Sequence, residues 1–387
     1  MRILMLNHNI AFGGATFDRV YNLGSQLARH GHQPTLMTIS KKDRFSFRSE
    51  SRDGVEVVQT PDLLWGIGRT GWDPYDTFRR VVHSQRRGYD AVYAFDSRPA
   101  VLMPALAYAY RHRVPLIMDW ADWWGRGGTI GERSFKTVSK IMGPLEGWLE
   151  EAFRTKAART TVISRALQER AAGLGVDPQT ILRIPNGSNI QAIQPSDMIE
   201  SRRKLGLPLD LPLIGHMGHL YPRDSELLKS ALEHALVECP TLRVVMLGRP
   251  GSQYDISWAA HPATITPGFV PMEDMAAWLG ACNALILPLT DSVHNRGRWP
   301  GKVNDYFAAG RPVISTAVGD MRDVLETYPV GVMAEPTGEA LGRAILEMLG
   351  DPERQEAMGK AARELAETDL SWERIAAKVQ QMLETLP

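Results

Sequence analysis

The chain has 387 residues, with 44 Lys and Arg against 44 Asp and Glu, and therefore carries no formal net charge. A general nucleic-acid binder needs a basic surplus to neutralise phosphates, so we expect no nucleic-acid partner. The length suits roughly two or three domains, and the hydrophobic fraction can bury a sizeable core. The two cysteines, Cys239 and Cys282, belong to no metal-ligand or redox spacing, which favours a reducing cytoplasm.

The apolar segments are short. The apolar start at residues 1–6 stops at Asn7, which is too early for the apolar region of a signal peptide. A second apolar stretch, residues 101–110, is interrupted by Pro104 and falls short of the roughly 20 residues that a bilayer span needs. We therefore expect a soluble, cytoplasmic protein.

In the first half of the chain, β-branched or apolar runs alternate with stretches of helical period. The stretch 16–30 places Val20, Leu23 and Leu27 on one face, which is typical of an amphipathic helix. A second helical stretch covers residues 100–111. The runs that predict strands are residues 2–6, 34–39, 55–58, 91–95, 115–118, 160–163 and 181–184. This alternation implies a parallel sheet covered by helices on both sides.

The same pattern restarts in the second half. Turn-forming residues punctuate the chain near Gly206 and Pro208, and we predict a linker over about residues 186–212. The runs that follow are residues 213–217, 242–247, 284–287, 312–315 and 330–333. Two successive parallel α/β series predict two doubly wound, Rossmann-like domains. A terminal amphipathic helix is expected over residues 372–386.

Ligands of doubly wound folds bind at the carboxyl ends of the strands, and we expect one between the two domains. Gly13 and Gly14 follow the first strand and precede a helix, so the backbone there could approach an anion closely. A tight turn explains this glycine pair about as well. The dinucleotide fingerprint Gly-x-Gly-x-x-Gly is absent, which argues against a nicotinamide oxidoreductase.

Residues 118–128 combine two carboxylates, three indoles and three glycines directly after an apolar run. Indole faces such as that of Trp123 stack on sugar rings, and the carboxylates of Asp119 and Asp122 can accept hydroxyl protons. We favour a binding loop over a buried aromatic patch with helix-capping aspartates, because such a composition suits a cleft. Asp96, which follows another apolar run, is a further candidate, although helix capping explains it nearly as well.

In the second half, Gly218, His219 and Arg223 follow the first predicted strand. Gly218 would admit a ligand, and the two cationic or polar side chains could donate to its phosphates.

Residues 295–315 carry the strongest signal. Arg296, Arg298 and Lys302 precede or open a short helix that carries Asp305. Cations at a helix start form a diphosphate site, and a carboxylate one turn further can bind ribose hydroxyls. An isolated basic loop would usually be a solvated surface, but this one lies between two apolar runs, which favours a site.

Metal-ligand spacings are missing from the sequence: it holds no Asp-x-Asp pair and no His-x-x-x-His or Cys-x-x-Cys. We therefore expect no metal ligand set and no cofactor. Cationic side chains would have to neutralise a diphosphate leaving group instead.

Together these residues resemble the GT-B glycosyltransferases, in particular the family-4-type retaining enzymes, over nearly the whole chain. The matching stretches are residues 13–14 with 27–32, 162–164 with 184–187, 268–271, 287–288, 302–314 and the helix from Trp372. The most specific is the sequence YFAAGRPVI at residues 306–314. The resemblance implies two Rossmann-like domains facing a central cleft: an acceptor-binding domain at 1–195 and a nucleotide-sugar-binding domain at 196–370. It also implies a helix at 371–387 that packs back on the first domain.

The resemblance also implies retaining transfer of a sugar from a nucleoside-diphosphate sugar to a hydroxyl of a carbohydrate, lipid-linked or small-molecule acceptor. On this basis we expect catalytic roles for Asp122, Arg223 and Lys302. The residues expected to bind substrates are Gly13, Gly14, Asp96, Asp119, Trp123, Gly218, His219, Gly248, Phe269, Val270, Arg296, Arg298 and Asp305.

The chain departs from the family at its paired glutamates. Asp305 stands in the place of the second glutamate, and Gly297 lies at the spacing of the first. Two alternatives to transfer therefore stay open. One is a nucleotide-sugar epimerase of the same architecture, and the other is a catalytically inactive nucleotide-sugar-binding protein.

The predicted helix at residues 133–157 places Ile141, Leu145, Trp148 and Ala152 on one face, after a basic start. Such a stripe could touch the inner face of a membrane. Packing in the core or between the domains is the simpler explanation and the one we favour.

Overall fold

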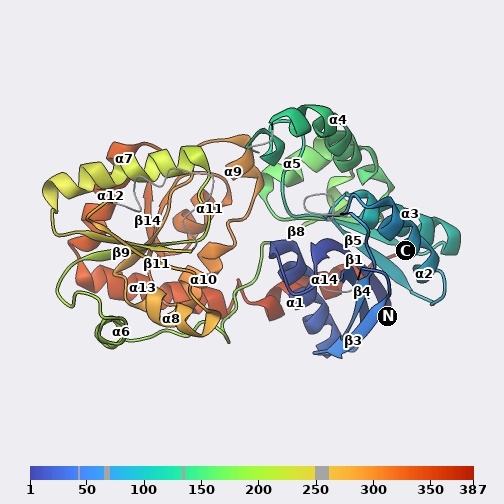
Figure 1. Ribbon diagram of the computed structural model, residues 1–387, viewed down its shortest axis with the longest axis horizontal. Helices are drawn as coiled ribbons and strands as arrows, with labels where there is room; N and C mark the ends of the chain where they lie inside the picture. The colour runs from blue at the N-terminus through green and yellow to red at the C-terminus, as the bar shows by residue number, and fades with distance from the viewer. Residues whose placement is uncertain (42–43, 65–69, 133–135, 249–260) are drawn as a thin grey trace. The chain divides into compact units, whose positions relative to one another are not determined.

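The computed structural model describes residues 1–41, 44–64, 70–132, 136–248 and 261–387, which form two compact units (Figure 1). Unit 1 comprises Met1–Asn186 and Trp372–Pro387, and unit 2 comprises Gly187–Ser371. The division thus falls at Asn186, whereas we expected it at residue 195. The terminal helix belongs to unit 1.

Unit 1 is built on an eight-stranded sheet with the order β3-β4-β2-β1-β5-β6-β7-β8. All its neighbouring strands are parallel except the edge strand β3, which pairs antiparallel with β4. The strands are β1 Arg2–Ile10, β2 Gln33–Ile39, β3 Arg48–Arg52, β4 Val55–Thr60, β5 Ala91–Phe95, β6 Leu116–Trp120, β7 Arg159–Val162 and β8 Ile181–Arg183. The α-helices are α1 Ala15–Arg29, α2 Pro74–Ser84, α3 Pro99–His112, α4 Lys136–Ala152, α5 Arg165–Gly173 and α14 Trp372–Glu384.

Alternation along β1 divides the core of unit 1 into two layers. Ile3 and Met5 pack with the apolar faces of α1 and α14, whereas Leu4 and Leu6 pack on the other side of the sheet with α3. Because successive side chains of a strand point to opposite faces, this central strand is buried on both sides. The C-terminal helix therefore completes the core of unit 1.

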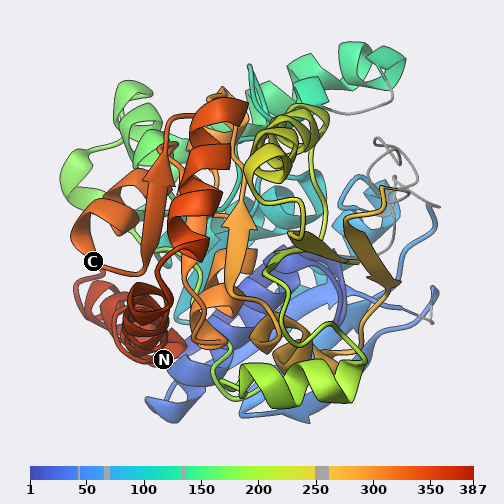
Figure 2. The ribbon, with the colours of Figure 1, turned by 90° about the vertical axis from the view of Figure 1, so that its left-hand side faces the viewer.

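Unit 2 contains a wholly parallel six-stranded sheet with the order β11-β10-β9-β12-β13-β14. Helices α7 and α12 cover one face and α8, α10 and α13 the other, as Figure 2 shows from the side of this unit. The strands are β9 Leu213–Met217, β10 Arg243–Leu247, β11 Thr264–Gly268, β12 Ala284–Leu287, β13 Val313–Thr316 and β14 Gly331–Ala334. The helices are α6 Met198–Leu205, α7 Pro222–Glu238, α8 Met272–Gly280, α9 Val293–Gly297, α10 Lys302–Ala308, α11 Asp320–Thr327, α12 Gly338–Leu349 and α13 Pro352–Glu367.

The predicted α/β class with two doubly wound units is confirmed, but three elements were missed. The edge strand β3 is exposed and polar, so it carries no hydrophobic signal. The edge strand β11 contains Pro267, which weakens a strand prediction. Helix α6 lies inside the predicted linker, where the Asp197 side chain caps it and Gly206, at φ 66°, ends it. Within the described ranges, no helix is long and apolar enough to cross a membrane.

The strand order sets where a ligand can bind in each unit. In unit 1 the chain runs outward in both directions from the pair β1 and β5, and in unit 2 from the pair β9 and β12. At such a reversal the loops after the two strands diverge and leave a crevice at the carboxyl edge of the sheet. The loops after these four strands hold most of the residues predicted to bind substrates.

Candidate active site

Lys302 is the central cation of unit 2. It opens α10, and its Nζ donates to the carbonyl oxygen of His219 at 2.8 Å and contacts Nε2 of His216 at 3.2 Å. His216 Nδ1 lies 3.0 Å from the carbonyl oxygen of Ile286, so Nδ1 carries the proton and Nε2 accepts from the lysine. Burial, and then the charge of Lys302, hold the pKa of His216 well below its usual range. The histidine is therefore a neutral acceptor for Lys302.

Burial also acts on the lysine itself. Desolvation, followed by the charge of Arg298, lowers the pKa of Lys302 to about 7, and Asp224 partly opposes this shift. The lowered pKa means that the groups around Lys302 do not fully balance the positive charge of its ammonium. A bound anion would supply what is missing.

Arg298 is the second cation of this cluster. Its side chain is 17% exposed, and its guanidinium lies 3.4 Å from Asp224 and over the ring of Tyr221. Asp224 is buried in the first turn of α7 and also accepts hydrogen bonds from Thr290 and Asn295. A carboxylate shared among so many donors anchors the arginine without neutralising it fully. Nε of Arg298 donates no hydrogen bond within the described chain.

Glycines bring the backbone of unit 2 close to these cations. Gly218 and Gly248 end β9 and β10 with φ of 79° and 128°, conformations that side chains rarely adopt. A Cβ on Gly218 would lie 3.9 Å from Nζ of Lys302, and one on Gly248 would lie 3.5 Å from Cα of Gly218. The two loops and Lys302 therefore share one small region at the carboxyl edge of the sheet.

Other predicted residues of unit 2 lie less centrally. Arg223 is exposed on α7, and its guanidinium makes no ion pair or hydrogen bond with any residue in the described ranges. Arg296 pairs with Asp291 at the exposed surface. Asp305 is half-buried on α10, one turn after Lys302. The expected trio of diphosphate-binding cations is therefore reduced to Arg298 and Lys302.

Two further residues that we predicted to bind substrates directly follow β11. Phe269 is exposed and Val270 is buried, directly after Gly268. Since Gly248 donates its N–H to the carbonyl oxygen of Gly268 at 3.0 Å, this segment adjoins the glycine loops. Its position suits a planar ligand beside the cation cluster.

In unit 1, Asp96 is the most unusual backbone position near the reversal point. It ends β5 with φ 96° and is buried, which is a strained conformation for a residue other than glycine. Its Oδ2 lies 3.0 Å from Nδ1 of His8, and its Oδ1 accepts from the N–H of Ser97. The 3.0 Å contact is not aligned as a hydrogen bond, so it is an electrostatic contact.

Charges around Asp96 keep it ionised. Burial alone would raise the pKa of Asp96, but His8, Arg98 and the Ser97 N–H together lower it. Burial lowers the pKa of His8 to about 4, so this histidine is neutral near pH 7. A carboxylate beside a neutral imidazole retains the capacity to accept further hydrogen bonds.

The Asp96 carboxylate borders a small hollow of about 10 Å³, which is room for roughly one water molecule. The indole of Trp120 forms one wall and carries the guanidinium of the buried Arg154 at 4.2 Å from its ring centre. The full lining is Thr16, Asp96, Ser97, Trp120, Ala121, Asp122, Trp124 and Arg154. The lining thus combines two carboxylates, a guanidinium, hydroxyls and indole faces, the groups that bind hydroxyl-bearing ligands, around a space that is itself too small for a ring.

The glycine pair of unit 1 forms the turn before α1. Gly14 has φ 92°, and a Cβ there would lie 3.1 Å from Cγ of Asn9. Asn9 Oδ1 accepts the N–H of Phe17 at 3.0 Å, and Gly13 donates to the carbonyl oxygen of Ile10. The pair is therefore required by the local turn, whatever it also does for a ligand.

Asp119 is a structural residue, contrary to our expectation that it contacts substrate. It lies on β6 and is fully buried, where it receives a bidentate ion pair from Arg19 at 2.9 Å and a hydrogen bond from Thr161 at 2.6 Å. No face of its carboxylate is left for a ligand. Trp123 also differs from expectation: it lies against Arg170 and borders neither of the hollows beside Asp96, where Trp120 and Trp124 are found instead.

The role of Asp119 leads to a stability prediction. Asp119→Ala leaves the buried charge of Arg19 without its carboxylate, and we expect a loss of about 3–5 kcal/mol of unfolding free energy. Asp90→Ala removes an exposed partner of Arg2 and should cost less than about 1 kcal/mol. Urea unfolding of both variants measures the difference. Equal, small losses would show that the Arg19 pair is not structural.

Several site residues carried no recognised signal in the sequence. His8 lies two residues after the predicted strand 2–6, and His216 lies inside the predicted strand 213–217. A titratable residue at the end of such a run could have drawn attention to both. Asp224 resembles an ordinary first-turn acid of a helix. Arg154 follows no strand, so only the folded chain brings it to Trp120.

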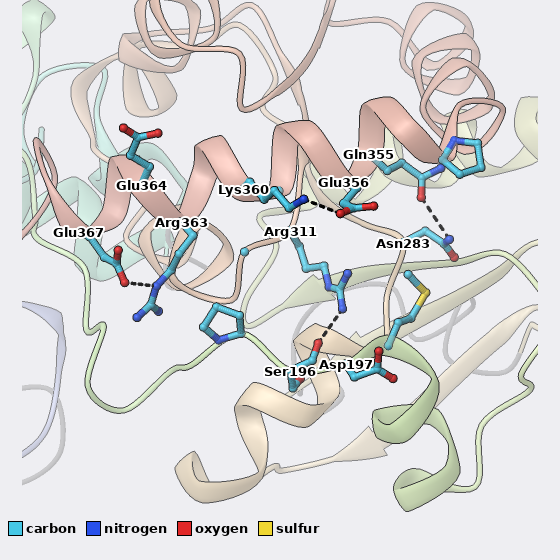
Figure 3. Close-up of a pocket in the computed structure, with 15 residues that line it drawn as sticks. Ser196, Asp197, Asn283, Arg311, Gln355, Glu356, Lys360, Arg363, Glu364 and Glu367 are labelled. Carbon is cyan, nitrogen blue, oxygen red and sulfur yellow. Dashed lines mark hydrogen bonds and ion pairs between the residues drawn. The ribbon is translucent and has the colours of Figure 1, made fainter.

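A larger groove of unit 2 lies away from these residues (Figure 3). Asn283 and Arg311, which line it, directly precede β12 and β13, so the groove lies at the amino edge of the sheet. Its other wall is the charged face of α13, where Lys360 pairs with Glu356 and Arg363 with Glu367. Over the part of the chain that the structure describes, no group of three or more His, Cys, Asp or Glu side chains is placed to hold a metal ion.

Two Rossmann-like units with these strand orders define a fold of the GT-B class. The sucrose-phosphate synthase of Thermosynechococcus elongatus has this fold and matches with a TM-score of 0.74 and 18% identity, over 100% of this chain and 98% of that chain. HepE of Anabaena, in complex with UDP and glucose, matches with a TM-score of 0.70 and 17% identity over 100% of both chains. At these identities the comparison establishes the fold alone.

The sequence itself identifies the family. The family model described as "Glycosyl transferase 4-like domain" matches residues 14–187, and that described as "Glycosyl transferases group 1" matches residues 211–351. The chain therefore belongs to the family-4-type GT-B glycosyltransferases. The predicted resemblance to this family is confirmed, whereas the retaining mechanism stays a prediction.

Two curated relatives extend this comparison. The GDP-mannose-dependent monoacylated alpha-(1-6)-phosphatidylinositol monomannoside mannosyltransferase of Corynebacterium glutamicum is 24% identical over 59% of this chain and 62% of its own length. The D-inositol 3-phosphate glycosyltransferase of Geodermatophilus obscurus is 28% identical over 52% of this chain and 46% of its own length. The alignments thus span about half to three-fifths of these relatives.

Proposed function

We propose that the protein is a retaining, metal-independent glycosyltransferase that moves a sugar from a nucleoside-diphosphate sugar to a hydroxyl of a polyhydroxylated ring. The observation that carries this proposal is the cluster of Lys302, Arg298 and neutral His216 beside the Gly218 loop. Two incompletely neutralised cations next to exposed backbone suit a diphosphate. The names of the relatives, which include GDP-mannose as a donor, support the nucleotide sugar.

The cation cluster would stabilise the leaving group. In the proposed reaction, the bond between the anomeric carbon and the phosphate oxygen breaks while the acceptor oxygen bonds to that carbon on the same face. The departing phosphate takes the acceptor proton, so no protein nucleophile is required. Negative charge grows on the diphosphate as the bond breaks, and fixed cations there favour the transition state over the ground state.

The acceptor would bind at the mouth of the small hollow of unit 1, against the residues that line it. Asp96 and Asp122 would accept hydrogen bonds from hydroxyl groups, and the indole of Trp124 would pack against a ring face. Both relatives described above are named for acceptors that contain inositol, a ring with several hydroxyls. A sugar or cyclitol ring is therefore the acceptor class that the hollow supports best.

The test is to incubate the protein with UDP-, GDP-, ADP- and TDP-sugars and free or lipid-linked polyol acceptors in EDTA, and to follow nucleoside diphosphate and product. We expect one donor to be consumed only with acceptor and the product to keep the anomeric configuration of that donor. A strict need for added divalent metal, or an inverted product, would contradict the proposal. An isomerised donor without release of nucleotide would indicate an epimerase, and tight binding without turnover would indicate a binding protein.

The lowered pKa of Lys302 predicts that nucleotide binding takes up a proton. At about pH 8 most free protein has a neutral Lys302, and a bound diphosphate raises the pKa of this lysine so that it becomes charged. Affinity for the nucleoside diphosphate should therefore fall as the pH rises above about 7. Calorimetry in buffers of different ionisation enthalpy measures the uptake, which Lys302→Met should abolish. Uptake that persists in the variant would assign the proton to another group.

A further inference from the structure

Helix α4 of unit 1 has its polar and apolar sides reversed relative to an ordinary surface helix. Ile141, Leu145 and Trp148 are 73%, 43% and 53% exposed. Their spacing of four and then three residues places them on one face. A helix in contact with water normally presents charged side chains there. This exposure contradicts packing of the stripe in the core of unit 1, one of the two arrangements that we favoured from the sequence.

The acidic residues of α4 point inward instead. Glu150 is buried and accepts hydrogen bonds from Nε1 of Trp120 and from the N–H groups of Trp124 and Gly125, at 2.8, 2.8 and 2.7 Å. Glu146 is also buried, and Glu151 pairs with Arg170 at 2.5 Å. Glu150 therefore holds the loop after β6, and none of these three carboxylates lies on the exposed stripe.

Lysines flank the exposed apolar stripe. Within residues 140–156 the exposed side chains are those of Lys140, Ile141, Pro144, Leu145, Trp148, Ala152, Thr155 and Lys156. The charged members of this set are both cations, one at each end. A bilayer with acidic lipids is apolar inside and anionic at its surface. An apolar strip between lysines is complementary to such a bilayer.

We propose that this face of α4, formed by Ile141, Leu145 and Trp148 between Lys140 and Lys156, binds the surface of an anionic lipid bilayer. The apolar side chains would enter the headgroup boundary, where an indole is favoured, and the lysines would contact acidic headgroups. A second copy of the chain fits less well. In a pairing of this face with itself, the like charges of Lys140 and Lys156 would lack partners, because residues 140–156 expose no carboxylate.

The opposite side of the same helix lines a second hollow that Asp96 also borders. Glu146 and Leu149 of α4 line this hollow on one side. Arg98 and Trp124, from other parts of unit 1, also line it. A bilayer bound to α4 would therefore hold the acceptor region of unit 1 within one helix diameter, about 10 Å, of the headgroups. This consequence rests on the proposed function and favours a lipid-linked acceptor, whereas bilayer binding itself does not depend on it.

The experiment is vesicle flotation of the full chain with phosphatidylcholine alone and with added phosphatidylglycerol. We expect binding to the anionic vesicles that weakens with salt. The double variant Ile141→Gln/Trp148→Gln should reduce the partition coefficient about tenfold or more. Lys140→Gln/Lys156→Gln should reduce it and remove most of the salt dependence. The matched control is Tyr110→Gln, which removes a 91% exposed ring from α3 of the same unit and should leave binding unchanged.

Several outcomes would overturn the proposal. The wild-type chain could fail to float with anionic vesicles, or the apolar double variant could float as well as the control. A dimer in light scattering that Ile141→Gln/Trp148→Gln converts to a monomer would assign the face to self-association. Thermal unfolding at the wild-type temperature verifies that each variant is folded. Turnover of a soluble acceptor should be unaffected by these variants, so failure of bilayer binding is distinguishable from failure of the transferase proposal.

Discussion

Lys302→Met should lower the turnover of the nucleotide sugar by about 10²- to 10³-fold, the usual effect of removing one fixed group that stabilises transition-state charge. The substitution keeps the length and apolar stem of the side chain and removes only the ammonium. Since that ammonium is buried, with its pKa lowered to about 7, its removal should not destabilise the fold. Steady-state kinetics over a range of donor concentrations, with thermal unfolding of the same samples, measure both effects.

A control for this substitution lies in the same unit. Lys360 is exposed on α13, where it pairs with Glu356, and Lys360→Met should leave turnover unchanged. If Lys302→Met retains turnover within about threefold of the wild type, the leaving-group role is wrong. If it loses turnover together with its thermal stability, the lysine is structural and the loss of activity says nothing about the reaction.

Several residues that the sequence singled out in unit 2 lie close together in the structure, and the physical cause is simple. Runs such as 91–95 and 213–217 coincide with β5 and β9, because buried parallel strands are continuous apolar segments. Once the strands are placed, the loops after them are known, and these loops contain Gly218, Gly248 and Lys302. The carboxyl edge of a doubly wound sheet then brings these residues together without further information.

The errors have an equally simple cause, which is that pairing partners lie far apart in the chain. Asp119 follows an apolar run as a ligand residue would, and only Arg19, one hundred residues away, makes it structural. Arg223 and Arg298 look alike in the sequence, yet a buried carboxylate holds one of them, while the other is left exposed on α7. Side-chain direction decides between Trp123 and Trp124, and local composition does not encode it.

The exposed stripe of α4 shows a second limit of prediction from the sequence. Its helical period is plain in the sequence, but a period shows only that apolar residues share a face and not what that face contacts. The buried glutamates show only which side of the helix is turned inward, because Glu150 is bound to Trp120 and to the loop after β6.

Asp96→Asn should lower kcat/KM for the acceptor by about 10²-fold while nucleoside-diphosphate binding stays unchanged, because a carboxylate held for substrate hydroxyls is lost from unit 1 only. Asparagine tolerates the left-handed backbone region better than most residues, so the native φ of 96° can be kept. Acceptor kinetics at saturating donor and calorimetric titration with the nucleoside diphosphate measure the two quantities separately.

Asp96→Gly distinguishes a functional from a structural role. Glycine adopts φ 96° without strain, so relief of the native conformation should offset much of what the fold loses with the carboxylate. We therefore expect Asp96→Gly to unfold at or near the wild-type temperature and yet to lose acceptor turnover as Asp96→Asn does. If Asp96 served only folding, both variants would unfold at lower temperatures than the wild type, and both would keep acceptor turnover once folded. The strained backbone at Asp96 fixes the direction in which the carboxylate oxygens accept hydrogen bonds. A binding role gives a reason for such strain to be kept at this position.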